Sequence, residues 1–294
     1  MHAQRLCLVF ILASPVKKRA YVPETKTFYL HLYKAKLSPD GFERVVWTVN
    51  GTYPEPTLVV TKWDRLVIYV INNLGVSTSI HYHVPNNTTF IFNFTVPDQS
   101  GTFWYHSHHL AQYVNGVLGA IIVKDPDDPY QNDYDEEVGL EPRPDNRLIN
   151  GRNNYNCKWA PVSYKCIDNA GLSKFNFVLE KRYRLRVINT GALLSFTFSI
   201  DEHAMDVIEV EGMMTKRHTI HRLIINVAQR YSVIVTANKL VSNFWMRADL
   251  QIKCYNAIGI EHLNPYVKAI VHYEGANYLD PTIQGWADNL NKKI

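Results

Sequence analysis

Two pairs of histidines could do chemistry in this sequence: His81 with His83, and His106 with His108. In a β-strand, residues i and i+2 project from the same face, so each pair is expected to form a fork of two imidazoles. Neutral imidazoles suit copper, zinc or iron(II), and each must be deprotonated to bind. A single His-X-His pair is usually a structural or surface feature, whereas two pairs this close together favour a metal site.

Short strands must position these ligands. The apolar run 119–123, just after the second pair, predicts a buried strand. Further strands are expected upstream, between Pro- and Gly-containing turns, at 26–37, 44–49, 57–60 and 64–72. Short strands at even spacing predict an all-β protein with a Greek-key barrel or sandwich.

A second set of strands follows an acidic stretch. Residues 126–145 are rich in Asp, Glu and Pro without a clear period, which predicts a solvated linker, and they lack the ordered spacing of a metal-binding loop. The expected strands beyond it begin near 148 and lie at 175–179, 183–189, 196–200, 206–211, 223–227, 229–237 and 244–247. We therefore predict two tandem domains, 21–125 and 146–275, followed by a C-terminal tail at 276–294.

Three segments carry a family resemblance: Ser-Ile-His-Tyr-His at 79–83, Val-Pro-Asp-Gln-Ser-Gly-Thr-Phe-Trp-Tyr-His-Ser-His at 96–108, and Gly-Val-Leu-Gly at 116–119. They resemble the first two copper motifs of the multicopper oxidases, and are most similar to those of laccases and fungal-type ferroxidases. The resemblance implies cupredoxin-like domains. Segments 182–189, 199–203 and 228–232 likewise resemble the second cupredoxin domain of laccases.

The resemblance also implies roles for the histidines. His81 would bind the type 2 copper, and His83, His106 and His108 would bind the type 3 coppers. His109 has no counterpart ligand and is interpreted as a neighbouring or surface residue. The second domain of the family carries no copper ligands, so structural or surface roles are expected for the remaining candidates, which are His203, His218 and His221.

Glu211 lies where laccases often keep an acidic residue near the pocket for the reducing substrate. A carboxylate there can accept the proton of a phenol as its electron leaves. The alternative is a solvated turn residue before Gly212.

The type 1 copper ligands of the family are missing from this sequence. They lie in a third domain, in a His-Pro-X-His-X-His motif and a His-Cys-His motif, and neither pattern occurs here. The third domain also supplies the other half of the trinuclear cluster. Two further departures are the short segment after His83, at 84–89, and Tyr82 in place of the usual Trp.

Two functions follow as hypotheses. The first is a truncated laccase-like oxidase, which would take electrons from phenols, aromatic compounds or metal ions and reduce O2 to water once a third domain completes it. The alternative is a catalytically inactive two-domain protein that binds copper or zinc, since a few imidazoles suffice to hold either ion.

Composition and charge exclude other classes. The formal net charge of +4 is spread along 294 residues without a basic stripe, so no nucleic-acid partner is expected.

Residues 1–20 resemble a short secretory leader, because Arg5 precedes an apolar run at 6–13 that is too short to span a bilayer. The leader predicts a secreted protein without a membrane span.

Cysteines and glycosylation triplets fit a secretory route. Cys157 and Cys166 are near enough in sequence for a local disulfide, which leaves Cys254 free or paired elsewhere. Asn-X-Ser/Thr triplets, the acceptor pattern for N-glycans, begin at Asn50, Asn86, Asn87 and Asn93.

Overall fold

The structure is a computed structural model that describes residues 21–53, 55–140, 142–143, 148–192, 194–251, 266–283 and 285–286. These residues form β-strands and one short 3-10 helix, η1 (Cys157–Trp159). The all-β prediction is therefore confirmed. The expected leader, Cys254 and the end of the C-terminal tail, at 287–294, lie outside the described residues.

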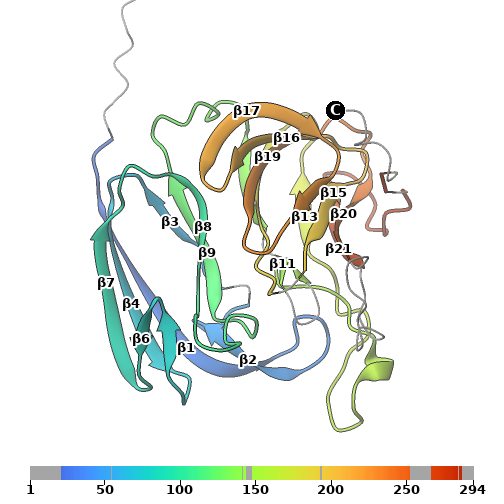
Figure 1. Cartoon of the computed structure of the whole chain (residues 1–294). Helices are drawn as coiled ribbons and strands as arrows, with labels where there is room; N and C mark the ends of the chain where they lie inside the picture. Colours follow the sequence, from blue (N-terminus) through green and yellow to red (C-terminus); the bar gives the residue numbers. More distant parts are fainter. Residues whose placement is uncertain are drawn as a thin grey trace, which may run out of the picture.

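The first half of the chain builds two facing sheets and a small hairpin (Figure 1). One sheet has the order β2-β1-β4-β7, the other β3-β9-β8, and β5 pairs with β6. The bounds are β1 (Thr25–Leu37), β2 (Arg44–Val49), β3 (Leu58–Thr61), β4 (Arg65–Asn73), β5 (Thr78–Ile80), β6 (Tyr82–Val84), β7 (Thr88–Thr95), β8 (Gly101–His106) and β9 (Leu118–Lys124). Alternating apolar residues such as Leu30, Leu66 and Val70 form the core between the sheets.

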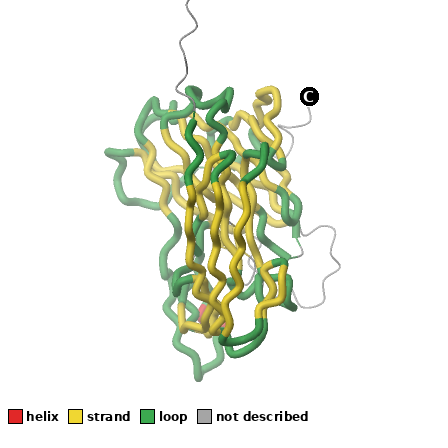
Figure 2. The backbone as a smooth tube through the Cα atoms, turned by 90° about the vertical axis from the view of Figure 1, so that its left-hand side faces the viewer, coloured by secondary structure: helices red, strands yellow, loops and turns green. Residues whose placement is uncertain are grey.

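The second half builds another pair of sheets around its own core. Their orders are β10-β14-β19-β16-β17 and β13-β21-β20-β15-β18, and a short β11-β12 pair lies beside them. The bounds are β10 (Glu136–Leu140), β11 (Pro142–Arg143), β12 (Leu148–Ile149), β13 (Lys174–Phe177), β14 (Arg182–Ile188), β15 (Phe196–Ile200), β16 (Met205–Val210), β17 (Met213–Ile220), β18 (Leu223–Ile225), β19 (Arg230–Thr236), β20 (Asn243–Leu250) and β21 (Tyr266–Tyr273). Figure 2 shows the long strands of the molecule running side by side.

Part of the predicted linker is a strand. Residues 126–145 were expected to be solvated and irregular, yet β10 pairs in parallel with β14, from Glu136 opposite Tyr183 to Leu140 opposite Val187. The linker prediction is wrong for this part, because strand pairing overrides a polar, aperiodic sequence. Strands β17 and β21 were also not foreseen. The exact domain boundaries remain a prediction.

A disulfide loop of the second half docks on the first half. Cys157 and Cys166 form a disulfide, the local pairing that their spacing allows, and the segment that it closes exchanges backbone hydrogen bonds with residues 39–43. The Glu43 amide donates to the Lys165 carbonyl and the Ile167 amide to the Gly41 carbonyl, both at 2.9 Å. Gly41 has φ +96°, and a Cβ there would lie 2.1 Å from the Ile167 oxygen, so this approach requires glycine.

Candidate metal centre

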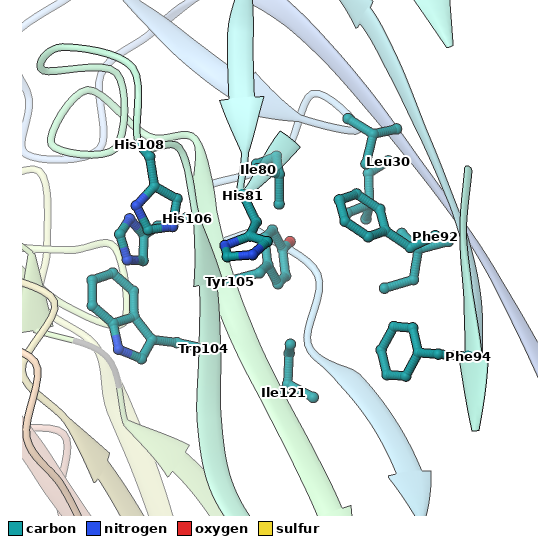
Figure 3. Close-up of a pocket in the computed structure, with 12 residues that line it drawn as sticks. Leu30, Ile80, His81, Phe92, Phe94, Trp104, Tyr105, His106, His108 and Ile121 are labelled. Atoms are coloured by element: carbon teal, nitrogen blue, oxygen red, sulfur yellow. The ribbon is translucent and has the colours of Figure 1, made fainter. Parts of the chain in front are cut away.

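Three of the four predicted ligands line one cavity between the sheets of the first half. The cavity measures about 220 Å³ and includes His81, His106 and His108 in its wall. The remaining lining residues are mostly apolar: Leu30, Ile68, Val70, Ile80, Phe92, Phe94, Trp104, Tyr105 and Ile121. In Figure 3, the rings of His106 and His108 lie together beside Trp104, and His81 stands between them and the wall formed by Leu30 and Phe92.

The imidazoles of this cavity are near neighbours. The ring centroids of His106 and His108 are 4.3 Å apart, and those of His81 and His108 are 6.2 Å apart. His106 ends strand β8, and His108 follows after one buried residue, Ser107. The second fork therefore forms at the end of β8 as the i, i+2 spacing predicts.

His106 is held in a form that suits a metal ligand. Its Nδ1 lies 3.0 Å from the Ser107 carbonyl oxygen, which can only accept, so Nδ1 carries the proton and Nε2 keeps a free lone pair. Metal-binding histidines commonly donate their second N–H in this way. Burial lowers the pKa of His106 and favours the neutral ring, and Trp104 stacks on it at 4.1 Å.

A buried polar cluster behind the cavity supports this segment. Gln112 accepts hydrogen bonds from Thr78 Oγ1 at 2.6 Å and Ser107 Oγ at 2.8 Å, and its amide donates to the Ser77 carbonyl at 2.8 Å. The His108 amide donates to the Ser79 carbonyl at 2.6 Å. These bonds fix the His106–His108 segment against β5. Gln112 was not predicted from the sequence, because a lone polar residue after a motif gives no sign of its burial.

The first histidine pair does not form the predicted fork. His81 has φ +71° and occupies the turn between β5 and β6, where Ile80 pairs with Tyr82. The expectation that His81 and His83 share one strand face is therefore wrong. The chain folds back at His81 as a tight hairpin, and His83 is exposed and not part of the cavity wall.

The ligand set is partial within the described residues. No group of three His, Cys, Asp or Glu side chains in the described part of the chain is close enough to hold one metal ion. The donor chemistry nevertheless fits copper, because His106 and His108 present imidazoles side by side and His106 is neutral with Nε2 free. His106 and His108 fit copper as a pair of ligands, and His81 lies on the same cavity with its ring centroid 6.2 Å from that of His108, whereas His83 does not lie with them.

The other predicted residues lie elsewhere. Glu211 occupies the β16–β17 turn, with φ +54°, and its carboxylate is paired with Arg230. This matches the alternative of a turn residue before Gly212, and a role in a substrate pocket remains a prediction. His203 is buried and bonded to Tyr273 at 2.6 Å, and His221 packs on Trp286.

A buried charge cluster joins β8 to the second half of the chain. Glu209, two residues before the predicted Glu211, is fully buried and accepts from Arg184 Nη2 at 2.8 Å and Arg186 Nη1 at 3.1 Å. It also accepts from the Thr102 amide at 2.7 Å. Thr102 lies in β8, the strand that ends at His106. The sequence does carry a sign that Glu209 is buried, because this carboxylate stands among the apolar residues of 207–210, but this sign was not recognised.

Comparison with known proteins decides the family. A family model described as multicopper oxidase matches residues 102–276, and a second model with the same description matches residues 31–84. The chain belongs to the multicopper oxidase family. Within this family it is laccase-like: it is 34% identical to a laccase of Phlebia radiata over 86% of this chain and 55% of the relative. It is 33% identical to laccase-1 of Agaricus bisporus over 89% of this chain and 58% of that protein.

Solved structures agree with this cupredoxin fold. The laccase from Botrytis aclada superposes with a TM-score of 0.78 at 29% identity, over 93% of this chain and 57% of that one. Fet3p, described as a multicopper oxidase that functions in iron import, gives a TM-score of 0.73 at 27% identity, over 91% of this chain and 56% of that one. The chain thus spans a little over half the length of these relatives.

The described part of the chain contains no helix with the length and apolar character needed to cross a membrane.

Proposed function

We propose that this chain supplies half of the ligands of a trinuclear copper cluster in a laccase-like oxidase. His81 would bind the type 2 copper, and His83, His106 and His108 would bind the type 3 coppers. The observation that carries the proposal is the meeting of His81, His106 and His108 on one cavity, with the Nδ1 proton of His106 directed to the Ser107 carbonyl. For His83 to join them, the β5–β6 hairpin must open, because His83 lies outside the cavity wall.

The activity proposed for the completed enzyme is oxidation of phenols, aromatic compounds or metal ions coupled to reduction of O2 to water. Bound copper would supply the one-electron chemistry and the site of O2 reduction. This chain's residues would orient the ligands: Ser107 fixes the tautomer of His106, Gln112 holds the His106–His108 segment, and Trp104 covers one face of the His106 ring. The type 1 ligands would come from a third domain, since neither of their motifs occurs in this sequence.

We also propose that the protein is secreted. The Cys157–Cys166 disulfide supports this location, because such bonds persist in oxidising compartments. The apolar, Arg-preceded leader at 1–20 points the same way.

The test is copper binding by the purified chain, measured as copper per chain after dialysis and by electron paramagnetic resonance. Changing His106 and His108 together to Ala should remove most of the bound copper, because the pair that lies side by side is lost. The matched control changes His218 and His221, which lie outside the cavity, and should bind as the parent does. Equal copper loss from both double variants would contradict the proposed location of the site in the first half of the chain.

The second candidate is a catalytically inactive two-domain protein that binds copper or zinc. Two observations favour it. The type 1 motifs do not occur in the sequence, and no three candidate ligands among the described residues lie close enough together to hold one metal ion. Oxygen uptake with a phenol separates the candidates. Bound metal without oxygen uptake, even after addition of a protein fragment carrying the two missing motifs, would favour the inactive protein.

A further inference from the structure

Strand β7 is an open edge of its sheet. Among the described residues it bonds, in the order β2-β1-β4-β7, only to β4, and it lies at the outer left of the molecule in Figure 1. None of its eight residues, Thr88–Thr95, is buried. Its pairing with β4 runs from Asn72 opposite Thr88 to Arg65 opposite Thr95 without a register shift. The backbone groups on its other side are therefore available to a further strand.

This edge lacks the charges, the proline and the bulge that protect natural edge strands, and it contains the glycosylation triplet that begins at Asn93. Its sequence, Thr-Thr-Phe-Ile-Phe-Asn-Phe-Thr, contains no charge and no proline, and its pairing contains no bulge. The other edges among the described sheets are short, charged or covered. Strand β2 has Arg44, β10 has Glu136, β17 has Lys216 and β13 has Lys174; β3 and β18 have four and three residues. Side chains of the second half of the chain cover β8 through its Thr102.

The two faces of β7 differ in what they present. Phe90, Phe92 and Phe94 face the cavity side, opposite Val70, Ile68 and Leu66 of β4. Tyr82 stacks on Phe90 at 5.2 Å, whereas Phe94 remains 46% exposed. On the other face Ile91 is 51% exposed. One face of the edge thus presents three phenylalanines, and the other presents Ile91 among uncharged polar residues.

We propose that β7 pairs with β7 of a second copy of this chain, in antiparallel register about a two-fold axis at Phe92. In this register Phe92 faces Phe92 of the other copy, and Phe90 faces Phe94. The other face pairs Ile91 with Asn93, and Thr89 with Thr95. Aromatic and β-branched cross-strand pairs of this kind stabilise a sheet, and no like charges meet. The two four-stranded sheets would become one continuous sheet in a closed dimer.

The sequence of β7 explains why a second copy fits this edge. A two-fold axis perpendicular to the sheet requires that residues on one face meet residues on the same face. Only an axis that lies between the two strands at the level of a residue, and not at the level of a peptide bond, achieves this. With the axis level with Phe92, all three phenylalanines meet phenylalanines of the other copy. The uncharged strand is therefore complementary to itself, and Phe94 gains a ring partner that none of the described residues of its own chain provides.

Sedimentation equilibrium of the full chain, produced without N-glycans, tests the proposal. The expected mass is twice 33.9 kDa, with dissociation on dilution. Ile91→Lys should give monomer at concentrations where the parent is dimeric, because the two introduced charges lie diagonally across the new pair. The matched control is Val45→Lys on β2, the opposite edge of the same sheet, where Val45 is 50% exposed; this variant should stay dimeric.

Cysteine cross-linking tests the register independently of the charge change. In a background with Cys7→Ser and Cys254→Ser, Phe92→Cys should give a disulfide-linked dimer under mild oxidation, because the two residues face one another. Ile91→Cys and Asn93→Cys, each alone, should cross-link far less, and the two changes combined in one chain should restore linkage. A chain that is monomeric at every concentration, an open-ended ladder of sizes, or equal linkage of all three single variants would overturn the proposal. Dimerisation is measured without metal, so its failure leaves the copper proposal untouched.

Discussion

Replacing Glu209 by Gln should destabilise the protein strongly although no volume changes. The Glu209 carboxylate accepts from Arg184 Nη2 at 2.8 Å, Arg186 Nη1 at 3.1 Å, Ser232 Oγ at 2.8 Å and the Thr102 amide at 2.7 Å. Removing one partner of a buried ion pair costs about 3–5 kcal/mol. Arg184 keeps an ion pair with Asp128, and Arg186 keeps one with Glu137, so the expected loss is at the low end, about 3 kcal/mol.

The pH dependence of this loss has a definite sign. Burial alone would raise the pKa of Glu209, but Arg186 and Arg184 outweigh burial and hold the pKa below its ordinary value. A carboxyl whose pKa is lowered by folding contributes stability that is fully present above the unfolded pKa of about 4.3 and is lost as the pH falls through the folded pKa. The difference between parent and Glu209→Gln should therefore be constant near pH 7 and shrink below about pH 4.3.

The assay is urea unfolding followed by tryptophan fluorescence at several pH values. Glu211→Gln is the matched control, because Glu211 is a partly exposed turn residue with a single ion-pair partner; its loss should be no more than about 1 kcal/mol. Equal losses from Glu209→Gln and Glu211→Gln, or a difference that grows as the pH falls, would refute the assigned role of the buried cluster.

Three further outcomes are expected. Gln112→Ala should cost about 1–3 kcal/mol, because buried Thr78 and Ser107 lose their acceptor, and should weaken copper binding, while Gln99→Ala, at an exposed site, should do neither; unchanged copper affinity would contradict the supporting role. Replacing both Cys157 and Cys166 by Ala should lower the free energy of unfolding by about 2–3 kcal/mol for a loop of this length, measured against reduced and oxidised parent protein. Burial lowers the pKa of His203, so the parent should lose stability as the pH falls below the unfolded value of about 6.5, and His203→Gln should flatten that part of the pH–stability curve; an unaltered curve would contradict it.

Most strands could be predicted from local sequence. β2 and β15 were predicted to the residue, and β1, β4 and β9 to within one or two residues, because alternating β-branched and aromatic residues bounded by turn residues specify a half-buried strand. β10 could not be predicted in this way. Its polar residues become a strand because β14 offers an unpaired edge, and that edge exists only after the sheet has formed.

The candidate site divides in the same manner. The His106–His108 fork follows from strand geometry at the end of β8, so the spacing alone predicted it. The His81–His83 fork did not form, since the chain turns at His81 between β5 and β6, and turn geometry depends on where the next strand pairs.

By itself the sequence determined the residue types: imidazoles in two pairs, two cysteines near enough for a local disulfide, and the periods of many short strands. Tertiary structure alone decided which polar residues are buried and which residues they contact through hydrogen bonds and ion pairs. Glu209 rather than Glu211 became the carboxylate between the two halves, and Gln112 became the support of the histidine segment. Burial is set by contacts between residues far apart in the chain, and local sequence patterns carry no information about such contacts.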